Sequence, residues 1–157
     1  RIPFLAIGYG MQLAVVEEAR SLLQIADAHT MEADCETKHA VVRIPEERIC
    51  QNDSRSRARM GLSSIKLADG MIKTLYGSDC IAERHSNRYE VDPAYVRALE
   101  EKGLKLAGSS VDAGYPEVFE LEGHPFYAAV VYHPEYISRP GKPHPLFLAL
   151  LKAALAK

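Results

Sequence analysis

The stretch that decides the fold is IPFLAIGYGMQLAVVEEAR, residues 2–20. Ile2 to Ile7 form an apolar run of the length of a buried strand, and Gly8-Tyr9-Gly10 is typical of a tight turn. From Met11 onward, apolar residues recur at helical spacing. A strand, a sharp turn and a helix in this order raise the residue at the apex of the turn above the sheet and direct backbone N–H groups at a ligand. The residue at that apex is Gly8, which has no side chain.

The composition is that of one ordinary globular domain. The 157 residues are 47% hydrophobic and 25% charged, with a formal net charge of −2, so a sizeable core is possible and no nucleic-acid partner is expected. No apolar run approaches the ~18 residues that a membrane-spanning helix needs. Three cysteines without paired or metal-binding spacing fit a reducing compartment better than a disulfide framework. We therefore expect one cytoplasmic domain over residues 1–157, without a membrane span, metal site or cofactor.

Apolar runs and turn residues predict alternating strands and helices along the rest of the chain. Strands are expected at residues 40–44, 80–83, 88–91, 104–107, 118–121 and 126–132. Helices are expected at residues 71–76, at residues 93–102 and from about residue 145, the last with Phe147, Leu148, Leu151 and Leu155 on one face. The middle helix has the clearest signals, because Asp92 is a suitable N-cap, Pro93 suits its first turn and Gly103 suits the position after its end.

These elements predict an α/β fold. Residues 2–7 and 126–132 are almost continuously apolar, so both are predicted to be interior strands of one sheet. Ligand sites in open α/β sheets lie at the carboxyl ends of the strands, which would bring Gly8 and His133 together. Residues 26–39 and 45–59 are polar and lack periodicity, so both are predicted to be loops, the second either a solvated loop or a lid over the site.

His133 and Glu135 directly follow the last predicted strand, in the sequence Tyr132-His133-Pro134-Glu135. Side chains alternate along extended chain, so these two point the same way. An imidazole takes a proton near neutral pH and a carboxylate fixes its tautomer, which gives two members of a catalytic triad. On the spacing alone, His133 is equally a structural histidine at a strand end.

Residues 3–17, PFLAIGYGMQLAVVE, resemble the elbow of the glutaminase domain of CTP synthase, a class I (triad-type) glutamine amidotransferase, which reads like PFLGICLGMQLAVVE. Further similar stretches follow in the same order, at residues 37–42, 75–77, 83–91, 99–105 and 132–145. The resemblance implies a flavodoxin-like, three-layer open sheet with helices on both faces. It also implies that a complete domain has further strands, helices and an oxyanion-hole loop before the elbow, so the domain is expected to be incomplete at its N-terminus.

The resemblance implies a set of site residues. The catalytic cysteine falls on Gly8, and its triad partners fall on His133 and Glu135. The positions implied to bind substrate are Gly8, Tyr9, Gln12, Glu32, Arg84 and His85. Glu32 matches a glutamate that holds the ammonium group of glutamine, although by residue type alone it is a solvated loop acid. Arg84 has the alternative of an exposed strand charge, and Gln12 that of a polar residue capping a helix.

Several positions depart from the family's pattern. They are Ala6, Gly8, Tyr9, Ser86, Asn87 and the glycines of a lid that responds to GTP, which matches RARMGLS at residues 57–63. Several independent changes around one pocket indicate drift after catalysis was no longer needed.

Two functions remain open. The first is a pseudo-amidotransferase, a non-catalytic module that docks on a synthetase domain or subunit, binds glutamine or a related molecule weakly, and forms an oligomer. The second is an enzyme that acts on another small amide or amino acid, with His133 and Glu135 as acid and base. A pocket filled by Tyr9 would favour the first, and an open pocket that retains Glu32 and His133 would favour the second.

Overall fold

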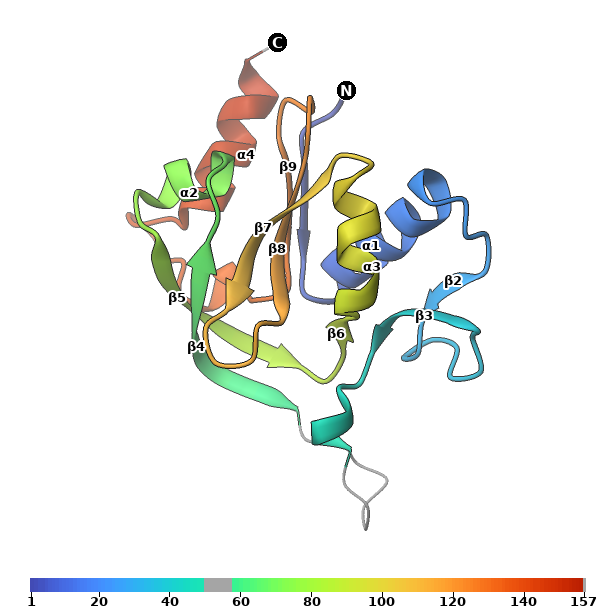
Figure 1. Ribbon diagram of the computed structural model, residues 1–157. Helices are drawn as coiled ribbons and strands as arrows, with labels where there is room; N and C mark the ends of the chain where they lie inside the picture. The colour runs from blue at the N-terminus through green and yellow to red at the C-terminus, as the bar shows by residue number, and fades with distance from the viewer. Residues whose placement is uncertain (50–57, 157) are drawn as a thin grey trace.

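The computed structural model describes residues 1–49 and 58–156, which form an α/β fold of three layers (Figure 1). Its central sheet has six strands in the order β1-β9-β8-β7-β4-β5. They are β1 (Phe4–Ile7), β9 (Tyr127–Val130), β8 (Pro116–Leu121), β7 (Leu104–Ser110), β4 (Arg59–Leu67) and β5 (Cys80–Asn87). The sheet is mixed, because β1 and β9 pair in parallel and the following pairs are antiparallel. The α/β class predicted from the sequence is confirmed.

Helices cover both faces of the sheet, as predicted. The helices α1 (Tyr9–Leu22) and α3 (Pro93–Glu100) lie on one face, and α2 (Met71–Tyr76) and α4 (Pro145–Leu155) lie on the other (Figure 1). A hydrophobic cluster lies on each face of the sheet, and β9 contributes side chains to both. Ala129 packs on the α1 side, and Ala128 and Val130 pack on the α4 side. No helix within the described residues is long and apolar enough to cross a membrane.

A second, three-stranded sheet lies beside α1. It consists of β2 (Ala28–Thr30), β3 (His39–Arg43) and β6 (Glu90–Val91). Two 3-10 turns complete the elements, η1 (Glu46–Arg48) and η2 (Pro134–Tyr136). The prediction of a loop at residues 26–39 is wrong for β2. That strand buries Ala28 and Thr30, but it is only three residues long, which is too short for a periodic signal.

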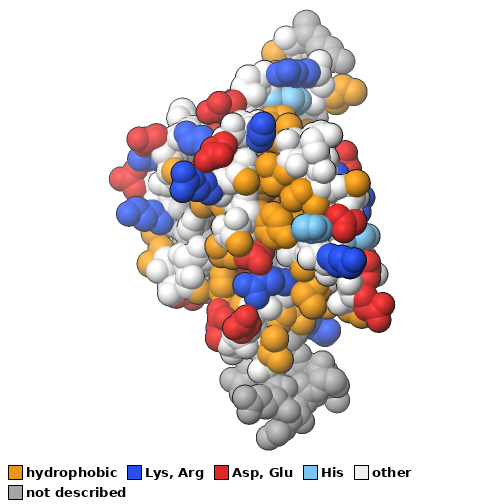
Figure 2. Space-filling view, turned by 45° about the vertical axis from the view of Figure 1, so that its right-hand side comes forward, with side chains coloured by type: hydrophobic (Ala, Val, Ile, Leu, Met, Phe, Trp, Pro, Cys, Tyr) orange, Lys and Arg blue, Asp and Glu red, His pale blue; other side chains and the backbone are white. Residues whose placement is uncertain are grey.

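Charged side chains of both signs are interspersed over the face shown in Figure 2, with hydrophobic side chains between them. This arrangement agrees with the small net charge of −2. A polyanion would favour a surface dominated by Lys and Arg, which this face lacks.

Strand β1 is not an interior strand of the described sheet, so that prediction is wrong. It stands at the end of the strand order and pairs with β9 alone among the described strands. The side chain of Phe4 is 40% exposed as a result. An apolar run favours a strand that has neighbouring strands on both sides. In the described sheet β1 has a neighbouring strand on one side.

The predicted loop at residues 45–59 and the lid at residues 57–63 are also only partly correct. Residues 50–57 lie outside the described residues, while residues 59–63 belong to β4 and pair with β5. Gly61 has a φ of +91° within this strand, a conformation that suits glycine. The strand was missed because its buried positions, Ile65 and Leu67, come late and its early part exposes Met60 and Leu62.

Helix α4 forms where it was predicted, but its apolar face was assigned wrongly. Leu146 is buried, and Ala149, Leu150 and Ala153 pack against the core. Leu148, Leu151 and Leu155, which were expected to share the inner face, are exposed. The helix is rich in leucine all round, so its periodicity does not select one face.

Helix α3 begins at the predicted cap. The Asp92 side chain accepts a hydrogen bond from the Ala94 N–H at 3.0 Å and one from Arg43 Nε at 2.6 Å. We expect Asp92→Ala to lower the free energy of unfolding by about 1–2 kcal/mol, because it removes the cap and a partly exposed ion pair. Asp92→Asn should lose less, since the amide oxygen still caps the helix. Urea unfolding measures both, and equal losses for the two variants would contradict the role of the cap.

Candidate functional site

The predicted elbow is present at the end of β1. The strand ends at Ile7, α1 begins at Tyr9, and Gly8 between them has a φ of +57° and a ψ of −121°. Its N–H donates to the Val130 carbonyl at 2.9 Å, which ties the elbow to β9. A positive φ is costly for residues that carry a Cβ, so this backbone suits glycine. The apex of the elbow therefore presents backbone and no side chain.

His133 reaches the elbow from the other side. Its N–H donates to the Arg84 carbonyl at 2.8 Å, which holds the turn after β9 against β5. Its Nδ1 lies 2.6 Å from Glu135 Oε1, and its ring stacks on Tyr136 with 4.8 Å between the ring centres. Because the Glu135 carboxylate accepts hydrogen bonds, it favours the tautomer of the neutral imidazole that has its proton on Nδ1 and its lone pair on Nε2. The predicted contact between His133 and Glu135 is formed.

The ring of His133 lies directly over Gly8. A Cβ added at Gly8 would be 3.0 Å from His133 Cε1 and 3.2 Å from His133 Nε2. The predicted meeting of Gly8 and His133 at one edge of the sheet is thus confirmed. A side chain on residue 8 would therefore be in tight contact with the imidazole, which would have to shift by a few tenths of an ångström.

A cavity of about 460 Å³ opens next to these residues. It is lined by Gly8, Tyr9, Gln12, Glu32, Ala58, Met60, Ser86, Asn87, Arg88 and His133. The structure thus brings together Gly8, Tyr9, Gln12 and Glu32 from the predicted substrate-binding residues. Tyr9 is 45% exposed, so it lines the cavity without filling it.

Sequence reasoning missed part of the lining. Ala58 directly precedes β4 and belongs to the predicted loop at residues 45–59, and Met60 lies near the start of that strand. Arg88 follows the end of β5 and is not among the site residues that the resemblance implied. The signal that could have found it is its place directly after Ser86 and Asn87.

Two predicted substrate-binding residues do not line this cavity. His85 is buried on the same face of β5 as Asn87, but it lies deeper in the strand, where its Nε2 is 2.7 Å from Glu117 Oε2. Arg84 contacts the site through its backbone carbonyl, while its side chain is exposed. The strand explains both positions, because β5 continues to Asn87 and successive side chains point to opposite faces.

Two amide side chains have their orientation fixed by their partners. Gln12 Nε2 donates to the Tyr89 carbonyl at 3.1 Å, and Asn87 Nδ2 donates to the same carbonyl at 3.0 Å and to Glu90 Oε1 at 2.9 Å. These partners only accept, so the amide nitrogens must face them. Gln12 Oε1 and Asn87 Oδ1 are then buried without a hydrogen-bond donor among the described residues.

The mouth of the cavity carries charges of both signs. Glu32 and Arg88 both line it and both are exposed. An α-amino acid has an ammonium group and a carboxylate group close together, so a carboxylate and a guanidinium at one opening suit a ligand of this kind.

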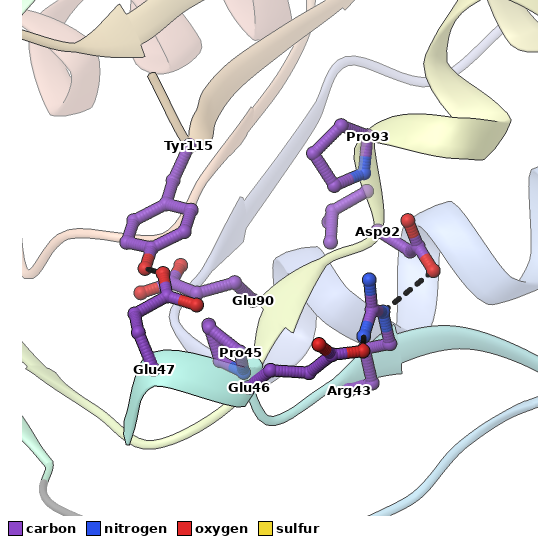
Figure 3. Close-up of a pocket in the computed structure, with 9 residues that line it drawn as sticks. Arg43, Pro45, Glu46, Glu47, Glu90, Asp92, Pro93 and Tyr115 are labelled. Atoms are coloured by element: carbon purple, nitrogen blue, oxygen red, sulfur yellow. Dashed lines mark hydrogen bonds and ion pairs between the residues drawn. The ribbon is translucent and has the colours of Figure 1, made fainter. Parts of the chain in front are cut away.

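A second, smaller cavity of about 280 Å³ lies between η1, β6 and α3, and Figure 3 shows the residues that line it. Its charged side chains are already paired with each other. Arg43 contacts Asp92 and Glu46, and the Tyr115 hydroxyl donates to Glu47, which lowers the pKa of that carboxyl. Burial raises the pKa of Glu90, which Arg48 and Arg59 hold by ion pairs. We therefore place the candidate site at the first cavity.

The described thiols are remote from Gly8. Cys35 and Cys80 are both exposed and neither lines the cavity beside His133, while Cys50 lies outside the described residues. Within residues 1–49 and 58–156, no three His, Cys, Asp or Glu side chains are arranged to hold a metal ion.

Comparisons with known proteins agree with this geometry. The family described as glutamine amidotransferase class-I matches residues 1–153. CTP synthase of Caldivirga maquilingensis is 46% identical over 157 residues, and CTP synthase 2 of Xenopus laevis is 43% identical over 159 residues. These matches cover 99% and 100% of this chain but only 29% and 28% of the two relatives.

A solved structure is similar over the whole chain. The Trypanosoma brucei CTP synthase glutaminase domain with bound acivicin has a TM-score of 0.92 and 30% sequence identity. The match covers 99% of this chain and 61% of that one. The flavodoxin-like amidotransferase fold predicted from the sequence is confirmed by this likeness.

Proposed function

Because the chain belongs to the class I glutamine amidotransferase family, we propose that it is a CTP synthase-like glutaminase domain that has lost its nucleophile and acts as a non-catalytic binding or regulatory module. The observation that carries this proposal is Gly8 at the apex of the elbow. Formation of a thioester from glutamine needs a thiolate at that point, and glycine has no nucleophile. The purified protein should therefore release no ammonia from glutamine.

The position of His133 supports the same proposal. Its ring occupies the space beside Gly8 and is held there by Glu135 and by the stacked Tyr136. A ring held in this place stabilises the turn after β9 without a substrate. We therefore propose that the pair now has a structural role.

The length of the relatives supports a partner. The chain spans 28–29% of the curated CTP synthases that it matches, so in those proteins the matching region is one part of a larger polypeptide. We propose a synthetase (amidoligase) domain or subunit as the partner, in an oligomeric, cytoplasmic assembly that serves pyrimidine nucleotide biosynthesis. Purification of the native complex followed by mass spectrometry tests this, and recovery of the chain without any synthetase would contradict it.

Glutamine binding should be weak. Ser86 and Asn87 line the cavity where the resembled family has arginine and histidine. Each lost charge-assisted hydrogen bond removes about 1.5–3 kcal/mol, which is at least a tenfold loss of affinity, so we expect a Kd near or above ~1 mM. Titration calorimetry measures this, with Glu32→Gln as the variant that should abolish the remaining heat. A micromolar Kd would contradict the prediction.

The open cavity favours a second candidate. It is not filled by Tyr9, and it retains Glu32 and His133 in its lining. Such a site supports an enzyme that acts on another small amide or amino acid, with His133 and Glu135 as acid and base. Ammonia release from a panel of small primary amides, compared between the wild type and His133→Gln, tests it. If the wild type releases ammonia from one of these amides and His133→Gln does not, the protein is an enzyme of this kind and the pseudoenzyme proposal is wrong.

A further inference from the structure

Strand β5 contacts the segment that carries His133 at two consecutive residues. The Arg84 carbonyl accepts the His133 N–H at 2.8 Å. The ring of His85 meets the ring of Tyr132 edge to face, with 6.2 Å between the ring centres. Arg84 and His85 were predicted to bind substrate, but neither lines the cavity. Their contacts instead connect β5 with the turn after β9.

A series of hydrogen bonds also joins Tyr132 to Glu83, the residue before Arg84. Tyr132 is fully buried, and its hydroxyl lies 2.9 Å from the Tyr76 hydroxyl. The Tyr76 hydroxyl donates to Glu83 Oε1 at 2.8 Å, so its oxygen accepts from Tyr132. Burial raises the pKa of both tyrosines, so both hydroxyls keep their protons at neutral pH. The direction of the series is therefore set by the Glu83 carboxylate, which accepts at its end.

The Glu83 carboxylate depends on a small number of donors. It is buried, and His144 Nε2 lies 2.9 Å from its Oε1. His144 Nδ1 accepts the Leu146 N–H at 3.2 Å, which favours the tautomer that has its proton on Nε2. Glu83 Oε2 has no hydrogen-bond donor among the residues that the structure describes. Because a buried carboxylate without hydrogen bonds is costly, the Tyr76 hydroxyl is held at Oε1.

We propose that Glu83 is a positioning residue, which holds the backbone of His133 in place through the two tyrosine hydroxyls. Glu135 and Tyr136 contact the imidazole and fix the ring, whereas the hydrogen bonds of Tyr132 fix the residue just before it. Both proposed functions leave the ring at the elbow, as a structural group in the first and as a base in the second. The inference therefore rests on the candidate site and does not depend on the loss of the nucleophile.

Tyr132→Phe tests the proposal, because it removes one hydroxyl and keeps the ring. Hydrogen exchange at the His133 amide should become at least about fivefold faster relative to exchange at the Asp92 amide, which donates to the Val41 carbonyl in the second sheet. A general loss of stability would speed both amides alike, so the ratio reports on the turn after β9. The measurement is made without glutamine, so its result is independent of whether the protein releases ammonia.

Three further variants separate positioning from general packing. Glu83→Leu removes the acceptor and should change the ratio as much as Tyr132→Phe, while Glu83→Gln keeps an acceptor oxygen and should change it less. Tyr127→Phe is the matched control, because it removes a buried tyrosine hydroxyl from the start of β9 and should leave the ratio unchanged. An unchanged ratio in Tyr132→Phe or in folded Glu83→Leu, or an equal change in Tyr127→Phe, would overturn the proposal. If Glu83→Leu does not fold, Tyr132→Phe and its control decide.

Discussion

Gly8→Cys is expected to leave the protein without glutaminase activity, although it restores the thiol that the family uses. A Cβ at this position would lie 3.0 Å from His133 Cε1 and 3.2 Å from Nε2, so the imidazole must move before a cysteine fits. Movement would strain the hydrogen bond to Glu135 and the stack on Tyr136. The φ of +57° adds a cost of about 1 kcal/mol for any residue with a Cβ. The backbone cost and the displaced imidazole both oppose a productive arrangement of the thiol and its base.

Ammonia release from glutamine, with and without GTP, measures this prediction. Gly8→Ala is the matched control, because it imposes the same backbone cost and the same contact with His133 but adds no thiol. The wild type, Gly8→Ala and Gly8→Cys should all lie at background. Turnover of Gly8→Cys near the ~1–10³ s⁻¹ usual for enzymes would show that the site is intact apart from one atom, and would overturn the pseudoenzyme proposal.

The local part of the site was predictable because its signals lie within short stretches. The elbow at Gly8 follows from an apolar strand, two glycines and a helical repeat, and the pair His133 and Glu135 follows from two residues after an apolar strand. Their meeting needed one further rule, that strands of an α/β sheet present their carboxyl ends at a common edge. The resemblance added Gln12 and Glu32, which do line the cavity.

The errors share another cause, since each depends on which face or neighbour a segment takes. His85 was placed in the pocket by the resemblance, and the extension of β5 to Asn87 was not foreseen. In that strand successive side chains point to opposite faces, so His85 is buried against Glu117 while Arg84 is exposed. Strand β1 was expected to be interior because its residues are apolar. An apolar run does not reveal how many strands flank it, and β1 stands at the end of the described strand order. The pairing of strands that are distant in the sequence decides both the face that His85 takes and the neighbours of β1. No local pattern in the sequence indicates that pairing.

The largest loss of stability is expected from Glu117→Ala. Glu117 is fully buried in β8, with its two oxygens 2.5 Å from Arg59 Nη1 and 2.7 Å from His85 Nε2. Arg59 also donates to Glu90 at 3.0 Å, so this group of four charged or titratable side chains joins β4, β5, β6 and β8. Burial lowers the pKa of Arg59, but the hydrogen bond and charge of Glu117 and the charge of Glu90 outweigh it and raise that pKa. Arg59 is therefore charged at neutral pH.

Removing one partner from a buried ion pair leaves the other charge without compensation, which costs about 3–5 kcal/mol. A domain of this size has a total stability of ~5–15 kcal/mol, so Glu117→Ala should unfold at a much lower urea concentration. Glu46→Ala, which removes an exposed partner of Arg43, is the control and should cost less than ~1 kcal/mol. A difference below 1 kcal/mol between the two variants would contradict the prediction.

The same substitution should also affect the candidate site. His85 and Asn87 project from the same buried face of β5, and Asn87 and the following Arg88 line the cavity. Loss of the Glu117 anchor frees this end of β5, so ligand binding should weaken even under conditions where Glu117→Ala remains folded. Glu117→Gln keeps one acceptor and the side-chain volume, and is expected to lie between the wild type and Glu117→Ala in both measurements. If binding is unchanged in folded Glu117→Ala, then β5 is positioned by its backbone pairing with β4 alone, and the buried charges serve stability only.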